Sequence, residues 1–428
     1  MTFFRAKIKS RALSLYRNVF VSQIPSGLLS WRYVFPSRDE RMHLHRSFWW
    51  SNATRQLGIL GIVIDLIKYV KWPFWSAWWR SYKVVRRFGN EVAIANNIPM
   101  AKQFWVTLKL SLNWCINPLD VYRFGLYKAP QKALDYVYDQ ETQAFHSWQS
   151  GRKKKTSESL RLIQDKLLLD AKLTALGIPM PTIYKNLPFS ANKTFEQSLD
   201  GLGPVFCKTR SGNQGLGAFA AWRTPDGWAG RSFEGHDLSD TQAIEKAWQS
   251  LLGRDEALIQ TLLINHAQLA ALTDMQEVIT VRYISIYKNT SLSCLSATLE
   301  VPADQHGESK RIAYVILPIE PLTGALLAWP ASNYLTKENK VRSEAVFERV
   351  PAQTVVPHWQ RLVELSHLAH QQLQDIATIA WDWVITPQGP VLLEGNAGWG
   401  TATPQMLMGG FLTHLRLDEK ESKDKFTY

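Results

Sequence analysis

Cysteine is scarce in this sequence: only three of its 428 residues are cysteines, namely Cys115, Cys207 and Cys294. They lie far apart and form neither a CxxC pair nor a mixed His/Cys pattern. This spacing argues against a disulfide scaffold and against a zinc site, and it fits a reducing compartment. The sequence also has no Ser/His/Asp or Cys/His signature of a protein nucleophile.

Long apolar runs are also missing near the N-terminus, where a membrane anchor would be sought. The longest run there, LGILGIVI at residues 57–64, stops at Asp65 and is far shorter than the roughly 20 residues that a spanning helix needs. The basic start of the chain is interrupted by Arg17 and is followed by no A-x-A site, so we expect no export. Apolar residues near the start could share the membrane-facing side of a surface helix: Ala12, Leu13, Tyr16, Val19 and Phe20.

The charge is concentrated at one end of the chain. Residues 1–100 contain 16 Lys and Arg but 4 Asp and Glu, whereas the other 328 residues carry 33 of each sign. The same basic segment holds 7 of the 18 tryptophans. Basic residues interleaved with Trp favour either a membrane surface or an acidic polymer, or else a basic subdomain whose aromatic side chains form its core. Nucleic acid is a weaker prediction, because no nucleic-acid motif is present.

The pattern of the chain changes near residue 150. Residues 1–100 predict short basic helices, 100–127 predict a helix that ends near Pro118, and 130–150 have helical periodicity. The segment GRKKKTSES at 151–159 has no apolar residue and is typical of a solvated linker. We therefore expect a basic, Trp-rich N-terminal region over 1–150, a second domain over 151–415 and a charged tail over 416–428.

The second domain alternates between helical and strand patterns. Residues 159–181 predict one amphipathic helix that stops at Gly177, and 359–374 predict another helix. Strands are predicted at 203–209, 219–224, 256–266, 277–287 and 291–302, and a strand–turn–strand unit at 376–398. The fold class is α+β (α/β), with a mixed, largely antiparallel sheet.

A glycine-rich stretch follows the first of these strands. Lys208 ends the strand, and RSGNQGLGA at 210–218 leads into the next one. Glycines let backbone N–H groups approach phosphate oxygens, and a lysine supplies a point charge. The pattern is neither a Walker A motif nor a GxGxxG fingerprint, and a flexible hairpin with a surface lysine is the alternative.

Carboxylates stand in an apolar setting in WDWVITPQGPVLLEGNAGWG, residues 381–400. Asp382 lies between two tryptophans, while Glu394 and Asn396 are two residues apart and project to the same side of a strand. The turn at 387–389 can bring Asp382 beside them. Magnesium prefers hard oxygen ligands, and a cation offsets the cost of burying carboxylates, so we predict a magnesium site. The alternative is a pair of exposed edge acids with a turn asparagine.

The order of these segments resembles the ATP-grasp superfamily, most closely its sugar-transfer-associated branch, which is also labelled alpha-L-glutamate ligase-related. The resemblance covers roughly residues 160–410. It rests on DKLLLDAKLTALGIPMP, VFCKTRSGNQGLGA, ALIQTLLINH, VRYIS and WDWVITPQGPVLLEGNAG in this order. The resemblance implies two α+β lobes with ATP between them, preceded by the largely helical N-terminal region.

The resemblance also implies roles for individual residues. Lys166 and Lys208 would contact the nucleotide, and Arg282 would face the γ-phosphate or the acyl phosphate; Lys208 and Arg282 would be catalytic. The loop over the phosphates would comprise Ser211, Gly212, Asn213, Gln214, Gly215 and Gly217. The hinge beside adenine would be Gln260, Thr261, Leu262 and Leu263, with His266 near the ribose. The ligands of two magnesium ions would be Asp382, Glu394 and Asn396.

Several of these residues keep alternative interpretations. Lys166 could be an ordinary helix lysine, and Arg282 could be a structural ion-pair partner. His43 and His45 share a strand-like face without a third ligand, so we expect no metal there. His367 and His370 predict a solvated helix face. Trp399 belongs either to the core or to an acceptor pocket.

The reaction implied by the resemblance is the ATP-dependent joining of a carboxylate to an amine through an acyl phosphate. We expect a small-molecule acid and amine, with an acidic or lipid-linked glycan as a further partner. The expected location is the cytoplasm, with peripheral contact at the inner membrane face through residues 1–100. The alternative is an inactive nucleotide-binding or membrane-peripheral scaffold protein.

Overall fold

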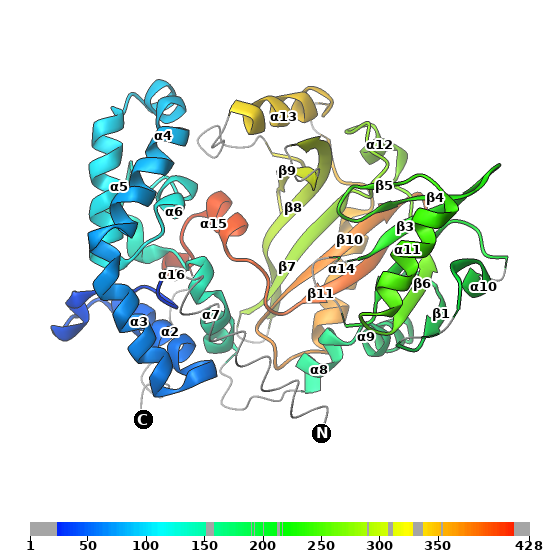
Figure 1. Ribbon diagram of the computed structural model, residues 1–428, viewed down its shortest axis with the longest axis horizontal. Coiled ribbons are helices and arrows are strands. Elements are labelled where there is room, and N and C mark those ends of the chain that lie inside the picture. The colour runs from blue at the N-terminus through cyan, green and yellow to red at the C-terminus, as the bar shows by residue number, and fades with distance from the viewer. Residues whose placement is uncertain are drawn as a thin grey trace. The chain divides into compact units, whose positions relative to one another are not determined.

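The computed structural model divides into two compact units (Figure 1). It describes residues 24–150, 158–189, 191, 193–199, 201–211, 215, 217–288, 291–306, 311–327, 337–351 and 354–414. Unit 1 draws on Met1–Lys153, Trp329–Lys340 and Gly398–Tyr428, and unit 2 on Lys154–Ala328 and Val341–Ala397. The predicted functional limits at residues 150 and 415 stay a prediction, and the predicted helix face at residues 12–20 lies outside the described residues.

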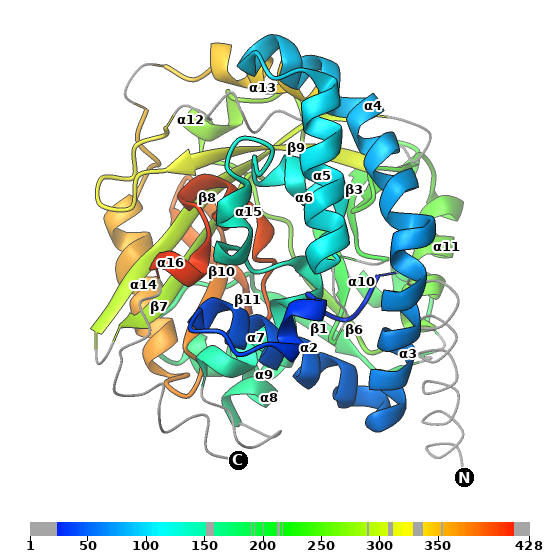
Figure 2. The same ribbon diagram turned by 90° about the vertical axis from the view of Figure 1, so that its left-hand side faces the viewer.

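Unit 1 is built from helices, which confirms the expected helical N-terminal region. Its α-helices are α2 (Glu40–Leu57), α3 (Ile59–Lys71), α4 (Ser76–Asn96), α5 (Met100–Trp114), α6 (Pro118–Arg123), α7 (Thr142–Gln149), α15 (Ala402–Met408) and α16 (Phe411–His414). Its 3-10 turns are η2 (Trp31–Val34), η3 (Trp72–Phe74), η4 (Pro130–Asp135) and η5 (Asp139–Glu141). Figure 2 shows the two long helices α4 and α5 side by side.

The expectation of short helices up to residue 100 is wrong, and the helical pattern predicted over 130–150 is confirmed for α7. Residues 40–96 form long helices with few interruptions. Between α2 and α3 the only interruption is one residue, Gly58, whose φ of 57° ends α2. Residues 130–150 form two 3-10 turns before α7, since the carboxylate of Glu141 accepts a hydrogen bond from the backbone N–H of Tyr138 at 3.3 Å and completes a capping box.

A buried ion pair joins separate parts of unit 1. His45 lies on α2, so the expected strand-like face is wrong, and its Nδ1 lies 3.0 Å from both carboxylate oxygens of Glu141. Both side chains are inaccessible to solvent. Glu141 also accepts a hydrogen bond from the backbone N–H of Leu28 at 3.0 Å. This pair therefore fixes α2 against η5 and the chain before α2. Trp399 is buried against His146 and Phe411, which places it in the core.

Unit 2 contains two antiparallel sheets. Sheet A has the order β1-β6-β2-β3-β4-β5, and sheet B the order β11-β10-β7-β8-β9. The strands of sheet A are β1 (Ile183–Leu187), β2 (Val205–Thr209), β3 (Phe219–Thr224), β4 (Gly227–Ser232), β5 (Asp237–Leu238) and β6 (Ala257–Thr261). Those of sheet B are β7 (Thr280–Lys288), β8 (Ser291–His306), β9 (Arg311–Ile319), β10 (Thr378–Thr386) and β11 (Gly389–Asn396). The expected α+β class is confirmed.

Helices complete unit 2. They are α8 (Glu158–Gln164), α9 (Lys166–Thr174), α10 (Phe195–Leu199), α11 (Thr241–Leu252), α12 (Ala267–Ala270) and α14 (Trp359–Gln371); α13 (Lys337–Glu348) lies at the boundary of the two units. The single helix expected over 159–181 is broken into α8 and α9. Asp165 caps α9 by accepting hydrogen bonds from the N–H groups of Leu167 and Leu168, which a residue inside a continuous helix could not do. In the described part of the chain, no helix is long and apolar enough to cross a membrane.

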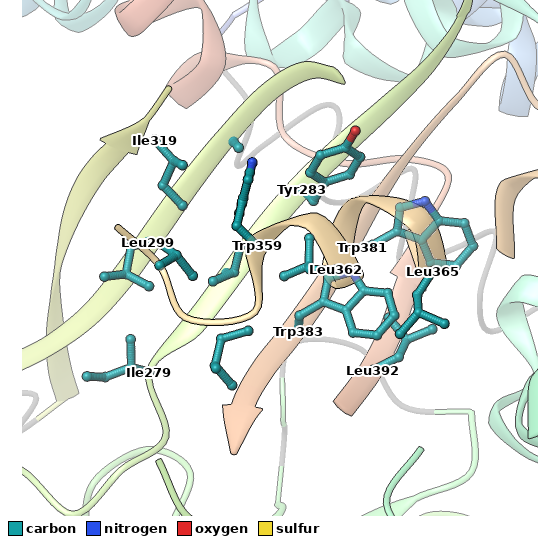
Figure 3. Close-up of a cluster of buried hydrophobic side chains, with 14 of the residues drawn as sticks. Ile279, Tyr283, Leu299, Ile319, Trp359, Leu362, Leu365, Trp381, Trp383 and Leu392 are labelled. Carbon is teal, nitrogen blue, oxygen red and sulfur yellow. The ribbon is translucent and has the colours of Figure 1, made fainter. Parts of the chain in front are cut away.

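The main core of unit 2 lies between sheet B and α14 (Figure 3). Tyr283, Trp381 and Trp383 point from the strands toward this core, because they alternate with Arg282 and Asp382 along β7 and β10. The expectation that His367 and His370 lie on a solvated face of α14 is wrong for His370. Its Nδ1 atom lies 2.6 Å from the hydroxyl oxygen of Ser285, and its ring is buried.

Candidate functional site

The face of sheet B opposite α14 carries a row of charged side chains. In the strand register, Asp382 of β10 stands directly across from Glu394 of β11 on one side and from Arg282 of β7 on the other. Residues that oppose each other in antiparallel strands project to the same face. The row is therefore a consequence of register, and the alternation that buries Trp381 and Trp383 places Asp382 on the charged face.

The three predicted magnesium ligands lie together in this row. The amide nitrogen of Asn396 lies 3.1 Å from Glu394 Oε1 and 3.4 Å from Asp382 Oδ2. A bulge between Asp382 and Trp383 shifts the register by one residue, so that Asp382 faces Glu394 while Trp383 faces Leu392. The structure thus brings the three side chains together, whereas their role as metal ligands stays a prediction.

The glycine between two of these residues is required by packing. Gly395 stands opposite Trp381, and a Cβ atom at this position would lie 2.6 Å from the ring of that tryptophan. Because Trp381 is completely buried, its ring has no open space into which to move. Glycine therefore lets β11 approach the core while Glu394 and Asn396 project to the other side.

Arg282 is bonded to carboxylates on both sides of its strand. Its Nε lies 2.8 Å from Asp382 Oδ1, its Nη2 3.1 Å from Asp382 Oδ2, and its Nη1 2.9 Å from Glu300 Oε1. Burial raises the pKa of Asp382, Arg282 opposes that rise, and Glu394 adds to it. The ion pair considered for Arg282 is therefore present, and contact with a phosphate stays a prediction. Sequence reasoning missed Glu300, although its place in the alternating strand pattern of SATLEVP was available.

Two lysines from sheet A and α9 lie close to Glu394. Burial first and the nearby charge of Lys166 second lower the pKa of Lys208 to about 8, against the opposing effect of Glu394 and Asp170. Burial likewise lowers the pKa of Lys166, and Glu394 again opposes the change. Two like charges held together in a poorly hydrated place are a characteristic arrangement for binding an anion. Lys166 also donates a hydrogen bond from Nζ to the carbonyl of Arg210 at 3.2 Å.

Arg210, which follows Lys208 and Thr209, forms an ion-pair network that the sequence analysis did not predict. Arg210 donates to both oxygens of Asp165, at 3.0 and 2.6 Å, and to Glu256 at 2.9 Å. This network ties the end of β2 to the start of α9, where Lys166 begins the helix. The signal available in the sequence was a basic residue, Arg210, directly after the predicted strand. The ion-pair network of Arg210 holds Lys166 near Lys208.

The glycine-rich loop is described in part. Ser211 donates its backbone N–H to Asp255 at 2.9 Å. Gly215 and Gly217 have φ angles of 63° and 78°, a region that favours glycine, and a Cβ on Gly215 would lie 2.2 Å from the ring of Phe233. Gly212, Asn213 and Gln214 lie outside the described residues. The predicted contact of this loop with phosphates stays a prediction.

The predicted hinge links the two sheets of unit 2. Gln260 and Thr261 end β6, and Leu262 and Leu263 lead toward α12 and β7. His266 donates its backbone N–H to the carbonyl of Ile385 in β10 at 2.7 Å. The segment therefore has the position expected for a hinge between two lobes. Contacts of these residues with adenine or ribose stay a prediction.

The side chains of the row fit a divalent cation chemically. Among the described residues, no three His, Cys, Asp or Glu side chains gather as a metal site. The set would therefore use the carboxylates of Asp382 and Glu394 together with the amide oxygen of Asn396. The Asn396 amide nitrogen now donates toward both carboxylates, the same place that a cation would occupy. Rotation of this amide by 180° presents its oxygen instead.

Comparison with known proteins gives one match to a family. The family described as sugar-transfer associated ATP-grasp matches residues 150–420, more than half of the chain. Comparison with curated proteins found no match. Among solved structures, D-alanine–D-alanine ligase from Bacillus anthracis is 14% identical with a TM-score of 0.35, over 60% of this chain and 66% of that one. Carboxyaminoimidazole ribonucleotide synthase from Aspergillus clavatus, complexed with ATP, is 13% identical with a TM-score of 0.33, over 60% of this chain and 50% of that one. This chain thus spans between half and two thirds of the length of these two structures.

Proposed function

The chain belongs to the sugar-transfer-associated ATP-grasp family, and on this premise we propose that it is an ATP-dependent carboxylate–amine ligase. The observation that carries the proposal is the charged row of sheet B with the two lysines beside it. Asp382 and Glu394 stand in register, Arg282 is bonded to Asp382, and Lys166 and Lys208 both lie near Glu394. This arrangement offers positive charge for phosphate oxygens and hard oxygen ligands for a divalent cation.

The reaction has two steps. A carboxylate oxygen of the acid substrate attacks the γ-phosphorus of ATP, so that an O–P bond forms and the bond to the β-phosphate oxygen breaks, releasing ADP. The amine then attacks the carbonyl carbon of the acyl phosphate, phosphate leaves with the electrons of the C–O bond, and the amine loses a proton. The chain contributes positioning and charge neutralisation, and no protein nucleophile is needed.

Each cluster of side chains has its own part in this proposal. Lys208 and Lys166 bind the phosphate oxygens, and their pKa values are lowered mainly by burial, to which the nearby charge of Lys166 adds at Lys208. Arg282 keeps Asp382 ionised and in place, and it faces the phosphoryl group in transfer. Asp382, Glu394 and Asn396 would hold magnesium, which supplies charge neutralisation between phosphate oxygens.

The substrates belong to cell-envelope or polysaccharide chemistry in this proposal. Support comes from the description of the family as sugar-transfer associated and from the basic segment 1–100 with its 16 Lys and Arg. An acidic glycan, or an amino acid that is joined to a sugar acid, suits both features. We place the reaction in the cytoplasm, where ATP is supplied.

The test is ADP release by the full chain with ATP and magnesium, over a panel of uronic acids and amino acids. We expect continuous release over many turnovers only with an acid and an amine together, at most one ADP per chain with the acid alone, and at least a 100-fold lower rate in the Asp382→Asn and Glu394→Gln variants. Asp226→Asn and Glu364→Gln change exposed carboxylates and serve as matched controls. Tight ATP binding without release over the whole panel would favour an inactive nucleotide-binding protein. Equal rates in all variants would exclude the proposed site.

A further inference from the structure

The buried residues of helix α3 in unit 1 are Gly61, Asp65 and Lys68, with Ile62 and Tyr69 packed in part beside them, whereas its exposed side is apolar, the reverse of a helix that faces water. Its outward side chains are aliphatic, and each is between 45% and 79% exposed: Ile59, Leu60, Val63, Leu66, Ile67 and Val70. Single exposed aliphatic residues are common on protein surfaces, but six on one helix of 13 residues form a continuous patch.

The inward face of α3 is held by polar contacts. Asp65 is 1% exposed, and its carboxylate accepts hydrogen bonds from the backbone N–H of Ser26 at 2.8 Å and from the indole of Trp49 at 3.1 Å. The Nζ of Lys68 lies 3.3 Å from the same carboxylate. A Cβ on Gly61 would lie 1.9 Å from the carbonyl oxygen of Ala53, so the close approach of α3 to α2 requires this glycine. Turning α3 to hide its aliphatic face would leave Asp65 without these partners, so its orientation is fixed.

Exposed aromatic side chains follow this patch along the chain, from η3 into α4. Phe74 and Trp75 are 80% and 68% exposed. The rings of Trp75, Trp79 and Tyr82 stack in sequence, with centroids 5.8 Å apart at each step. The rings therefore line one side of α4 while Ala77, Ser81 and Val85 bury the other. Tryptophan and tyrosine prefer the boundary between water and hydrocarbon, because one end of each ring is apolar and the other polar.

The charge around this patch has one sign. Residues 59–90 contain six basic side chains and one acidic side chain, Asp65, which is buried. Lys71, Lys83, Arg86 and Arg87 are exposed, and the Nζ of Lys83 lies 4.9 Å from the centroid of the Trp79 ring. A long basic side chain beside an interfacial tryptophan can lay its stem on apolar surface and reach a phosphate with its charged end.

We propose that this surface, formed by residues 59–87 and called here the α3–α4 surface, docks on an anionic lipid bilayer. The aliphatic face of α3 enters the acyl boundary, the rings from Phe74 to Tyr82 lie at headgroup depth, and Lys71, Lys83 and Arg86 pair with lipid phosphates. The excess of positive charge selects an anionic membrane over a neutral one. Docking is independent of the proposed ligase reaction.

The experiment measures binding of the full chain to vesicles of phosphatidylcholine, alone or with 30% phosphatidylglycerol, by flotation. We expect the wild type to bind the anionic vesicles and to dissociate at high salt. The Ile59→Ser/Ile67→Ser/Phe74→Ser variant should lose at least 90% of the bound fraction. The Lys71→Glu/Lys83→Glu/Arg86→Glu variant should partition at least about 100-fold more weakly onto anionic vesicles.

Matched controls come from unit 2. Phe189→Ser/Leu322→Ser removes equally exposed apolar side chains, and Lys172→Glu/Lys193→Glu/Lys246→Glu reverses three exposed charges. Both controls should bind vesicles as the wild type does, and circular dichroism melting should show all variants folded. Three results would overturn the proposal. The first is a wild type that binds neither kind of vesicle, and the second is binding of the α3–α4 variants as strong as that of the controls. The third is a wild-type dimer in sedimentation that becomes a monomer in the α3–α4 variants and that is unchanged by added vesicles. The last result would assign the surface to a second copy of the chain.

Discussion

Replacing Lys208 by methionine should make the folded protein more stable while it abolishes nucleotide binding. The pKa of Lys208 falls from 10.5 to about 8, mainly through burial and then through Lys166. Since one pKa unit corresponds to about 1.4 kcal/mol, keeping this ammonium charged at pH 7 costs the folded protein about 3 kcal/mol. That figure is an upper limit, because the half-buried ammonium keeps part of its hydration.

The dependence of the free energy of unfolding on pH shows whether the charge of Lys208 causes this difference in stability. Between pH 8 and 10.5 the unfolded chain keeps a proton on Lys208 that the folded protein has released, so the free energy of unfolding of the wild type rises with pH in this window. The Lys208→Met variant lacks this rise. Its advantage over the wild type should therefore be largest below pH 8 and should vanish by about pH 10.5.

The assay combines urea unfolding with calorimetric titration of ATP in the presence of magnesium. We expect the free energy of unfolding of Lys208→Met to rise by about 1–3 kcal/mol at pH 7, and its affinity for ATP to fall at least about 30-fold, the cost of losing one charge that pairs with a buried phosphate. Lys246→Met, at an exposed position of α11, should change neither quantity. A variant that is less stable than the wild type, or that binds ATP equally well, would refute the reasoning.

Three further predictions concern other groups of the two units. Arg282→Met should lower the free energy of unfolding by about 1–3 kcal/mol, because two mostly buried carboxylates lose a cation that is itself partly exposed; urea unfolding measures this, and adding Asp382→Asn should recover part of it if the ion pair is the cause. Gly395→Ala should cost about 1–3 kcal/mol by overpacking against the Trp381 ring, and an unchanged melting temperature would contradict the contact. Burial would lower the pKa of His45, but Glu141 outweighs burial and raises it. The stability that Glu141 adds is therefore complete below about pH 6.5 and declines as the pH rises through the raised pKa of His45. The difference in free energy of unfolding between the wild type and Glu141→Gln, measured by urea unfolding, should decrease over the same pH range.

The sequence predicted β2, β3, β6, β7, β8, β10, β11 and α14 of unit 2, whose signals are local, but it did not predict β1, β4, β5, β9 or α11. In β7, Val281 and Tyr283 alternate with the polar residues Thr280 and Arg282, and this alternation indicates both the strand and its buried face. Gly177, with φ 74°, ends its segment as predicted. The neighbours Glu394 and Asn396 needed only the strand period and one short turn to be placed beside Asp382.

What the sequence could not predict depends on partners far away in the chain. Glu300 meets Arg282 through the register of β7 and β8, which no local pattern specifies. His370 carries no mark that it faces Ser285 rather than water. Asp165 looks like an ordinary polar position of one long helix, and its other partner, Arg210, lies 45 residues further on. In α3 the apolar pattern was visible, but only the contacts of Asp65 show that the apolar side faces outward.

The central claim is that the charged row of sheet B, with Lys166 and Lys208 beside it, binds ATP together with a divalent cation. Calorimetric titration of the wild type and of Glu394→Gln with ATP, each with magnesium and with a chelator, tests it most directly. We predict one site per wild-type chain, with affinity that falls at least tenfold when magnesium is removed or Glu394 is replaced. Absence of heat from the wild type, or equal binding by the Glu394→Gln variant, would contradict the claim.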